Sequence, residues 1–153
     1  MTDIMTCLWF DNRIDDAIEF YTGTFKSAKI LRRVRRDAHT PTAIAEIELE
    51  GHRFMLLNGG PQFTFSEAVS FVIGCRDQDE VDYFWDTLTS GGGSPGQCGW
   101  CKDRFGLSWQ VVPDQLAGTI GGADPAGAQR ATEAMFKMTK LIIADLQQAY
   151  AGN

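Results

Sequence analysis

Hydrophobic and polar positions along the chain alternate with two periods, a period of two that is typical of strands and a period near 3.6 that is typical of amphipathic helices. In the first half, the shorter period predicts strands over 4–10, 29–36, 42–51 and 52–60. The longer period predicts a helix within 11–25, which should end near Gly23 because glycine favours helix C-termini. The first half therefore predicts one strand, one helix and three further strands.

The second half repeats this order after a loop over 59–65. A buried strand is predicted over 68–75 and a second amphipathic helix over 76–90. A glycine-rich break at 91–96 then precedes a pair of strands within 96–113. The chain closes with a long predicted helix over about 125–150, whose apolar residues recur near helical spacing at Ala131, Met135, Met138, Ile142 and Leu146.

The two halves also resemble each other residue by residue. An offset of 64 places Phe20 and Tyr21 on Phe84 and Trp85, and an offset of 55 places residues 51–57 on 106–112. Two βαβββ modules are therefore predicted, the second with a degraded third strand near its glycines. We expect an α+β fold in one domain over 1–153, with modules at about 3–60 and 66–113 and the C-terminal helix at about 125–150.

Composition and charge narrow the function classes. The chain has 153 residues and a net charge of −6, which disfavours nucleic acid and anionic membranes as partners. The basic run at 32–36 alternates with a hydrophobic residue, as on a solvated edge strand. No apolar run reaches the length of a membrane span, and no secretion signal is visible, so a cytoplasmic protein is expected. Four cysteines are too few for a disulfide framework.

Three segments resemble a known family: "CLWFDNRIDDAIEFY" at 7–21, "CGWCKDRFGLSWQVVP" at 98–113 and "AMFKMTKLIIADLQQAY" at 134–150. They are similar to the PhnB-like branch of the vicinal oxygen chelate superfamily, which includes glyoxalase I, extradiol dioxygenases and bleomycin-resistance proteins. Members of this branch are often labelled demethylubiquinone methyltransferase. The resemblance implies a cupped, mostly antiparallel sheet with flanking helices, a homodimer, and a small-molecule cavity inside the cup.

The resemblance also implies a divalent metal held by the first and fourth strands of each module. The repeat alignment gives these four positions as Thr6, Met55, Ser70 and Gln110. None of the four carries a charge, and the Met55 thioether suits oxygen-preferring metals poorly. We therefore expect no metal and no other cofactor.

Cys98 and Cys101 have the C-x-x-C spacing of redox pairs and zinc sites. A turn at 103–106 predicts instead a hairpin in which 96–102 is extended, so that the two sulfurs lie on opposite faces. Pairing Cys101 with Ser108 then directs the Cys101 thiol into the cup, whereas Cys98, Trp100 and Trp109 pack against helices. This arrangement excludes a Cys98–Cys101 disulfide and shared zinc ligation.

The same alternation gives the candidate cavity. Its expected lining is largely apolar with a few neutral polar groups: Thr6, Leu8, Phe10, Met55, Leu57, Ser70, Val72, Cys101, Ser108 and Gln110. Because no acid, base or metal set accompanies it, the sequence favours a protein that binds an unidentified small molecule. An enzyme of the glyoxalase and dioxygenase superfamily remains the alternative, and a dimeric interaction module is a third possibility.

Two further expectations concern the methyltransferase label and the oligomeric state. A Rossmann-type S-adenosylmethionine site needs a glycine-rich turn between a strand and a helix, and the runs at 90–96 and 119–127 lie elsewhere. The label is therefore unsupported by the residues. A homodimer is expected because the open sheet and the apolar C-terminal helix expose more hydrophobic surface than one small chain covers.

Overall fold

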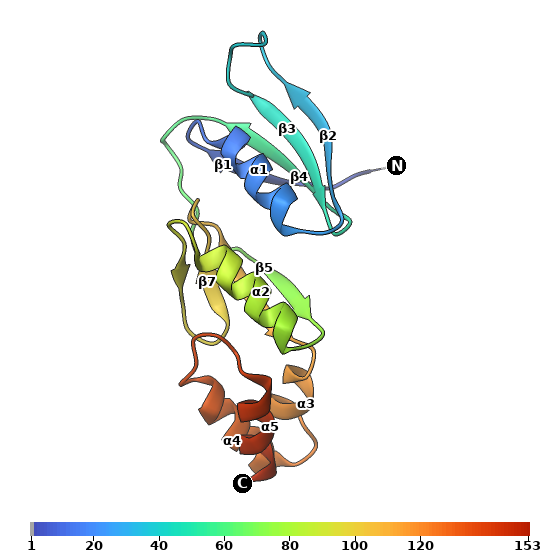
Figure 1. The fold of residues 1–153 in the computed structure, drawn as a ribbon, viewed down its shortest axis with the longest axis vertical. Coiled ribbons are helices and arrows are strands. Elements are labelled where there is room, and N and C mark those ends of the chain that lie inside the picture. The colour runs from blue at the N-terminus through green and yellow to red at the C-terminus, as the bar shows by residue number, and fades with distance from the viewer. Residues whose placement is uncertain (1) are drawn as a thin grey trace. The chain divides into compact units, whose positions relative to one another are not determined.

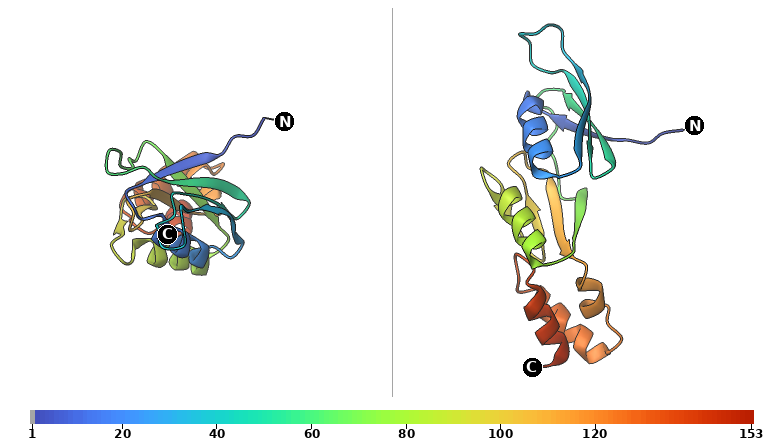
Figure 2. Two further views of the ribbon diagram at one scale, coloured as in Figure 1. Left: turned by 90° about the horizontal axis from the view of Figure 1, so that it is seen from above. Right: turned by 45° about the vertical axis from the view of Figure 1, so that its right-hand side comes forward.

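The computed structural model describes residues 2–153, and the chain divides into two compact units, Met1–Phe65 and Ser66–Asn153. Each unit has a four-stranded sheet with one helix along one face (Figures 1 and 2). In each sheet one neighbouring pair of strands is parallel and the other two are antiparallel. The predicted α+β class with two mostly antiparallel modules is therefore confirmed.

The first unit follows the predicted order of elements. Its strands and helix are β1 (Thr6–Phe10), α1 (Ile14–Thr24), β2 (Ala28–Val34), β3 (Ile44–Leu49) and β4 (His52–Asn58). The strand order in the sheet is β1-β4-β3-β2, so that β1 and β4 lie side by side and run parallel. The three strands β2, β3 and β4 form an antiparallel meander. Glu50 and Gly51 form the turn between β3 and β4, and both have a positive φ.

Helix α1 covers one face of this sheet because its apolar residues recur with helical spacing. Ile14, Ala17, Ile18 and Tyr21 are at most 1% exposed. The sheet residues that face them alternate with exposed or half-buried ones, and they are Leu8, Phe10, Ala45, Ile47, Leu49, Phe54 and Leu56. Full burial of one such aliphatic or aromatic side chain contributes about 1.5–3 kcal/mol. Among residues 2–65, no other helix packs on this sheet.

The second unit repeats this arrangement with shorter strands. Its elements up to residue 113 are β5 (Ser70–Cys75), α2 (Gln78–Thr89), β6 (Ser94–Pro95), β7 (Trp100–Lys102) and β8 (Ser108–Pro113). The strand order is β5-β8-β7-β6, with β5 parallel to β8. The third strand of the module is reduced to the two residues of β6, as the glycine-rich sequence predicts, because glycine and proline support strand pairing poorly.

The repeat is confirmed at the level of the helices. The buried residues Ala17, Tyr21 and Thr24 of α1 correspond, at an offset of 64, to Val81, Trp85 and Leu88 of α2, which are also buried. The first strands do not keep this offset. The buried residues of β1 have even numbers, whereas the buried Cys75 of β5 and its half-buried neighbours on that face have odd numbers. An odd offset therefore relates the two first strands.

The C-terminal region contains three helices, α3 (Leu116–Ile120), α4 (Pro125–Met135) and α5 (Ile143–Ala151). The last two, α4 and α5, replace the one long helix that was predicted over about 125–150. The segment 136–142 between α4 and α5 is not helical because its backbone bonds elsewhere: the carbonyls of Met138 and Thr139 accept hydrogen bonds from the N–H groups of Cys98 and Gly99, at 2.9 and 2.8 Å. We call this segment, residues 136–142, the clasp.

Side chains of α2 hold the clasp in place. The Gln78 amide donates to the Leu141 carbonyl at 3.1 Å and accepts from the Ile143 N–H at 2.9 Å. The Lys140 ammonium lies 3.0 Å from the Asp82 carboxylate and 3.5 Å from the Asp86 carboxylate. Leu141 itself is fully buried. The clasp is therefore part of the second unit.

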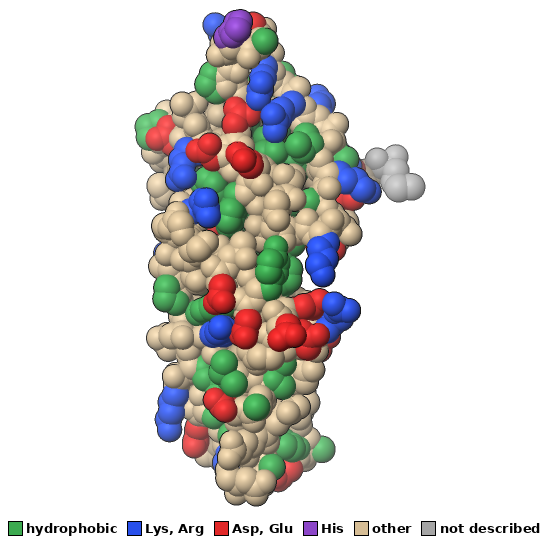
Figure 3. All heavy atoms as spheres, in the orientation of Figure 1, with side chains coloured by type: hydrophobic (Ala, Val, Ile, Leu, Met, Phe, Trp, Pro, Cys, Tyr) green, Lys and Arg blue, Asp and Glu red, His purple; other side chains and the backbone are tan. Residues whose placement is uncertain are grey.

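Within residues 2–153, no helix is both long enough and apolar enough to cross a membrane. Lys and Arg side chains are interspersed with Asp and Glu side chains over the face shown in Figure 3.

Candidate ligand-binding site

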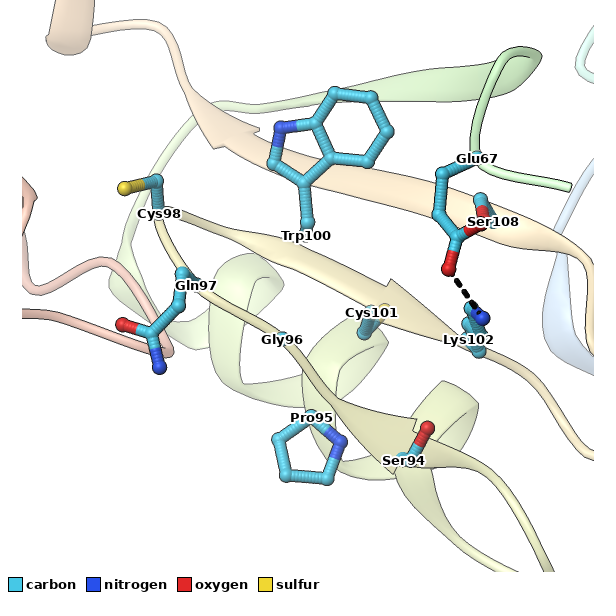
Figure 4. Close-up of a pocket in the computed structure, with 10 residues that line it drawn as sticks. All are labelled: Glu67, Ser94, Pro95, Gly96, Gln97, Cys98, Trp100, Cys101, Lys102 and Ser108. Atoms are coloured by element: carbon cyan, nitrogen blue, oxygen red, sulfur yellow. Dashed lines mark ion pairs between the residues drawn. The ribbon is translucent and has the colours of Figure 1, made fainter.

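A pocket of about 600 Å³ opens on the sheet of the second unit, and we call it the Trp100 pocket (Figure 4). It is lined by Glu67, Ser94, Pro95, Gly96, Gln97, Cys98, Trp100, Cys101, Lys102 and Ser108. These residues come from the loop before β5, from β6 and the turn after it, and from the β7–β8 hairpin. The pocket therefore belongs wholly to one unit.

The β7–β8 hairpin exists as predicted, but its register differs by one residue. Lys102 pairs with Ser108, Cys101 with Trp109 and Trp100 with Gln110. The prediction paired Cys101 with Ser108 because it assumed a four-residue turn. The observed loop has the three residues 104–106, closed by Gly106 at φ 84°, a conformation that glycine adopts without strain.

Asp103 explains why the loop is one residue shorter. Its N–H bonds to the Leu107 carbonyl at 3.0 Å, so it extends the ladder instead of opening the turn. Its carboxylate accepts hydrogen bonds from the N–H groups of Phe105 and Leu107 and from Trp109 Nε1, at 2.9, 3.1 and 2.9 Å. Asp103 is 2% exposed, so these donors replace the water that a buried carboxylate loses.

The corrected register exchanges the faces of two predicted residues. Cys101 borders the Trp100 pocket, but it lies on the same side of the sheet as buried Trp109, so the face that the prediction gave its side chain was wrong. Burial raises the pKa of the Cys101 thiol to about 12, with a smaller contribution from the Asp103 carboxylate, and the thiol stays protonated at neutral pH. Trp100 lies on the open side beside Gln110, whereas the prediction packed it against a helix.

Residues 96–102 are not extended throughout, in contrast to the prediction. Cys98 and Gly99 form a turn with φ of 57° and 83°, and the Trp100 N–H donates to the Gln97 carbonyl at 3.0 Å. A left-handed φ is uncommon for cysteine, and the hydrogen bonds from Cys98 and Gly99 to the clasp hold it. All four cysteines are free thiols, and Cys98 is half-buried at the pocket rim.

The predicted cavity residues of the first unit fall on two different faces. Leu8 and Phe10 are buried on the α1 side. Thr6 precedes Leu8 by two residues and so lies on the same side, where its hydroxyl oxygen is 3.2 Å from His52 Nε2. Their assignment to the cup was wrong. Met55 and Leu57 do lie on the open side, opposite the Phe54 face. The error arose because β1 is apolar on both sides, so its alternation does not reveal which side faces the helix.

In the second unit the remaining predicted residues share the open face of the sheet. Ser70, Val72, Ser108 and Gln110 occupy alternate positions opposite the buried residues of β5 and β8. Gln110 Nε2 donates a hydrogen bond to the Ser70 hydroxyl at 2.9 Å, and Ser108 borders the Trp100 pocket.

The four positions that the family resemblance gives to metal ligands do not fit a divalent metal. Thr6 and Met55 lie on opposite faces of the first sheet, so they cannot share an ion. Ser70 and Gln110 are neutral and bond to each other. In the part of the chain that the structure describes, no three His, Cys, Asp or Glu side chains come close enough to hold a metal.

Sequence reasoning missed an ion pair at the pocket. The Lys102 ammonium bonds to the Glu67 carboxylate, and the dashed line in Figure 4 marks this contact. The hydrogen bond from Lys102 lowers the pKa of Glu67 below its ordinary value. Glu67 lies in a loop without periodicity, so no sequence pattern connected it to Lys102.

A pair of βαβββ units, each with one helix-covered face and one open face, defines the glyoxalase-like fold of the vicinal oxygen chelate superfamily. The family model described as 3-demethylubiquinone-9 3-methyltransferase matches residues 2–112. The chain belongs to this family, the PhnB-like branch that the sequence motifs indicate. Residues 113–153, which include the clasp, lie outside the matched region.

Solved structures agree with this assignment. A putative 3-demethylubiquinone-9 3-methyltransferase, PhnB protein, from Bacillus cereus is 27% identical with a TM-score of 0.66, and the match covers 73% of this chain and 99% of that one. Protein PA1353 from Pseudomonas aeruginosa is 16% identical with a TM-score of 0.59, covering 74% and 98%, which supports the fold alone. No curated protein matches the chain.

Proposed function

We propose that this protein binds a small organic molecule in the Trp100 pocket without a catalytic metal. The observation that carries the proposal is the pocket itself, an open hollow of about 600 Å³ on the uncovered sheet face, with an indole, hydroxyls and one ion pair around it. Binding sites for small molecules are concave, with aromatic surface and a few polar groups.

The residues at the pocket favour binding over catalysis. The one ionised pair, Glu67 and Lys102, is internally neutralised, and the buried Cys101 thiol is a poor nucleophile because its pKa is raised to about 12. The methyltransferase named in the family description finds no support here. The glycines at 91–93 follow α2 and lead into β6, and those at 121–122 separate α3 from α4, so neither forms the strand-to-helix turn of a Rossmann site.

Binding of the neutral fluorescent dye N-phenyl-1-naphthylamine tests the proposal. Wild-type protein should enhance the dye's emission with saturation, and Trp100→Ala should weaken binding about three- to tenfold, because a contact between two aromatic rings contributes about 0.5–1.5 kcal/mol. Tyr83→Ala is the matched control, since Tyr83 is an exposed aromatic residue of α2 outside the pocket lining. Equal dye affinity for wild type and Trp100→Ala would refute the proposed site.

We also propose that the protein is a homodimer. Val69 lies directly before β5 and Val72 within it, and the two residues are 60% and 62% exposed. Apolar surface of this kind is commonly covered by a second copy of the chain. Light scattering should give about twice the chain mass of 16.9 kDa, and a monomer at micromolar concentration would contradict the proposal.

A further inference from the structure

Ser108 has a buried polar atom that the described residues leave without a partner. The residue is 1% exposed, and its hydroxyl oxygen makes no hydrogen bond within residues 2–153. Ser108 nevertheless borders the Trp100 pocket. An unpartnered buried hydroxyl costs about 1–3 kcal/mol, so a group that bonds to it from the pocket would recover free energy.

Lys102 lies directly opposite Ser108 in the hairpin. The two residues are cross-strand partners on the open face, which brings their side chains to within about 5 Å at the Cβ atoms. The Lys102 side chain is 41% exposed, and its ammonium is bonded to the Glu67 carboxylate. The Lys102 ammonium and the Ser108 hydroxyl are therefore neighbours in the pocket lining, and the Glu67 carboxylate already binds to the ammonium.

The bound carboxylate is easily displaced. Glu67 is 62% exposed and comes from the loop before β5, not from a strand. Exposed ion pairs of this kind contribute only about 0–1 kcal/mol. A ligand carboxylate that reaches both Lys102 and the Ser108 hydroxyl would gain a hydrogen bond that Glu67 does not make.

The neighbouring surface indicates the rest of the ligand. Trp100 lies two residues before Lys102 on the same strand, so its side chain shares the open face and borders the same pocket (Figure 4). An indole ring offers a flat apolar surface for offset stacking of another ring. Trp100 thus offers the pocket a flat aromatic surface, and Lys102, on the same face of β7, offers it a site for an anion.

From this arrangement, and building on the proposed function, we propose that the ligand is a flat aromatic carboxylate. Its carboxylate binds Lys102 and the Ser108 hydroxyl, and its ring lies against Trp100. In the free protein, Glu67 occupies the carboxylate position and is released when the ligand binds. Glu67 therefore lowers the affinity of the pocket for anions, and Ser108 raises it.

Calorimetric titration with 2-naphthoate and 2-naphthalenemethanol tests the proposal, because the two probes share a ring system and differ in charge. Wild-type protein should bind the carboxylate about tenfold more tightly than the alcohol. Lys102→Met should abolish this preference by weakening naphthoate binding about tenfold. Glu67→Gln should tighten naphthoate binding about threefold, because it removes the competing carboxylate. Lys137→Met, on an exposed residue outside the pocket lining, is the charge-matched control.

Ser108→Ala separates a ligand role from a structural one. It should weaken naphthoate binding about fivefold without lowering the melting temperature, because it removes a hydroxyl that has no partner in the folded protein. A lowered melting temperature with unchanged naphthoate affinity would overturn the assignment of Ser108.

The remaining outcomes are equally decisive. Equal affinity for both probes, or weaker naphthoate binding by Glu67→Gln, would overturn the carboxylate site while leaving the pocket intact if N-phenyl-1-naphthylamine still binds. Failure of all three compounds to bind would instead overturn the proposed function itself.

Discussion

The carboxylate of Asp103 accepts a hydrogen bond from the indole nitrogen of Trp109 at 2.9 Å, and both residues are at most 3% exposed. The bond joins the hairpin loop to the face of β8 that packs toward α2. Because the same carboxylate also receives two backbone N–H groups of the loop, one side chain determines both the loop conformation and the register of β7 against β8.

Asp103→Ala should therefore destabilise the protein by about 3 kcal/mol, since it leaves buried N–H groups without their acceptor. Urea unfolding followed by tryptophan fluorescence measures the change. Trp109→Phe removes only the indole donor and should cost less than Asp103→Ala. A change below 0.5 kcal/mol for Asp103→Ala would show that the loop does not depend on this carboxylate.

Cys98 should react before Cys101, although the predicted hairpin packs Cys98 against a helix and directs the Cys101 thiol into the cup. Cys98 is half-buried at the pocket rim, whereas Cys101 is 3% exposed with its pKa raised to about 12. Iodoacetamide at pH 8 should label Cys98 well before Cys101, and Cys101 should stay slow through pH 9 because the thiolate is the reactive form. Peptide mass spectrometry over time measures both rates. Faster labelling of Cys101 would contradict the observed register.

Asp15 should make the stability of the first unit depend on pH. Partial burial acts to raise the pKa of Asp15, but hydrogen bonds from the Thr42 hydroxyl, the Thr42 N–H and Arg35 outweigh it and hold the pKa below its ordinary 3.8. The stabilisation is present above pH 3.8 and is lost as the pH falls through the lowered value. It should amount to about 1 kcal/mol because the carboxylate is partly exposed to solvent.

Urea unfolding of wild type and Asp15→Asn at pH 7 and pH 2.5 checks this dependence. The difference between the two proteins should be largest at pH 7 and should shrink at pH 2.5, which lies below the ordinary pKa of 3.8, because the unfolded wild-type chain then takes up a proton at Asp15. Asp16→Asn is the matched control, since Asp16 is 72% exposed and its one ion-pair distance, to Arg13, is 3.9 Å. A difference that persists unchanged at pH 2.5 would contradict the assignment.

Loosening the clasp should free the turn at Cys98. Gln78→Ala removes both hydrogen bonds from α2 to the backbone around the clasp. Amide exchange at Cys98 and Gly99 should then accelerate at least tenfold, because their N–H groups bond to the clasp carbonyls. Gln129→Ala, which breaks an exposed bond within α4, is the control and should leave these amides unchanged.

The order and type of most elements could be predicted from the sequence because hydrophobic periodicity reports directly on which face is buried. The helices illustrate this, since the buried Tyr21 and Trp85 lie at the predicted offset. The C-terminal helix could not be bounded in this way. Met138 has the right spacing for a helix, but its carbonyl bonds to Cys98, forty residues earlier in the chain.

The candidate site was predicted only in part for a related reason. Period two gives the set of residues that share a face, but a one-residue change in loop length exchanges the two sets. The sequence "KDRFGLS" is compatible with a four-residue or a three-residue loop, and the buried Asp103 carboxylate decides between them. Ser108 and Gln110 were assigned to the correct face because β8 has one face that is apolar throughout, whereas Cys101 was not.

The clasp has a consequence for where this protein can be cut. The region shared with the family ends at residue 112, yet the turn at Cys98 takes its hydrogen-bond partners from residues 138 and 139. A fragment trimmed to the shared region would lose those acceptors and the buried Leu141 that packs on Gly99. The region that is similar to relatives therefore ends at residue 112, whereas the segment needed to keep the pocket rim folded extends at least to residue 141.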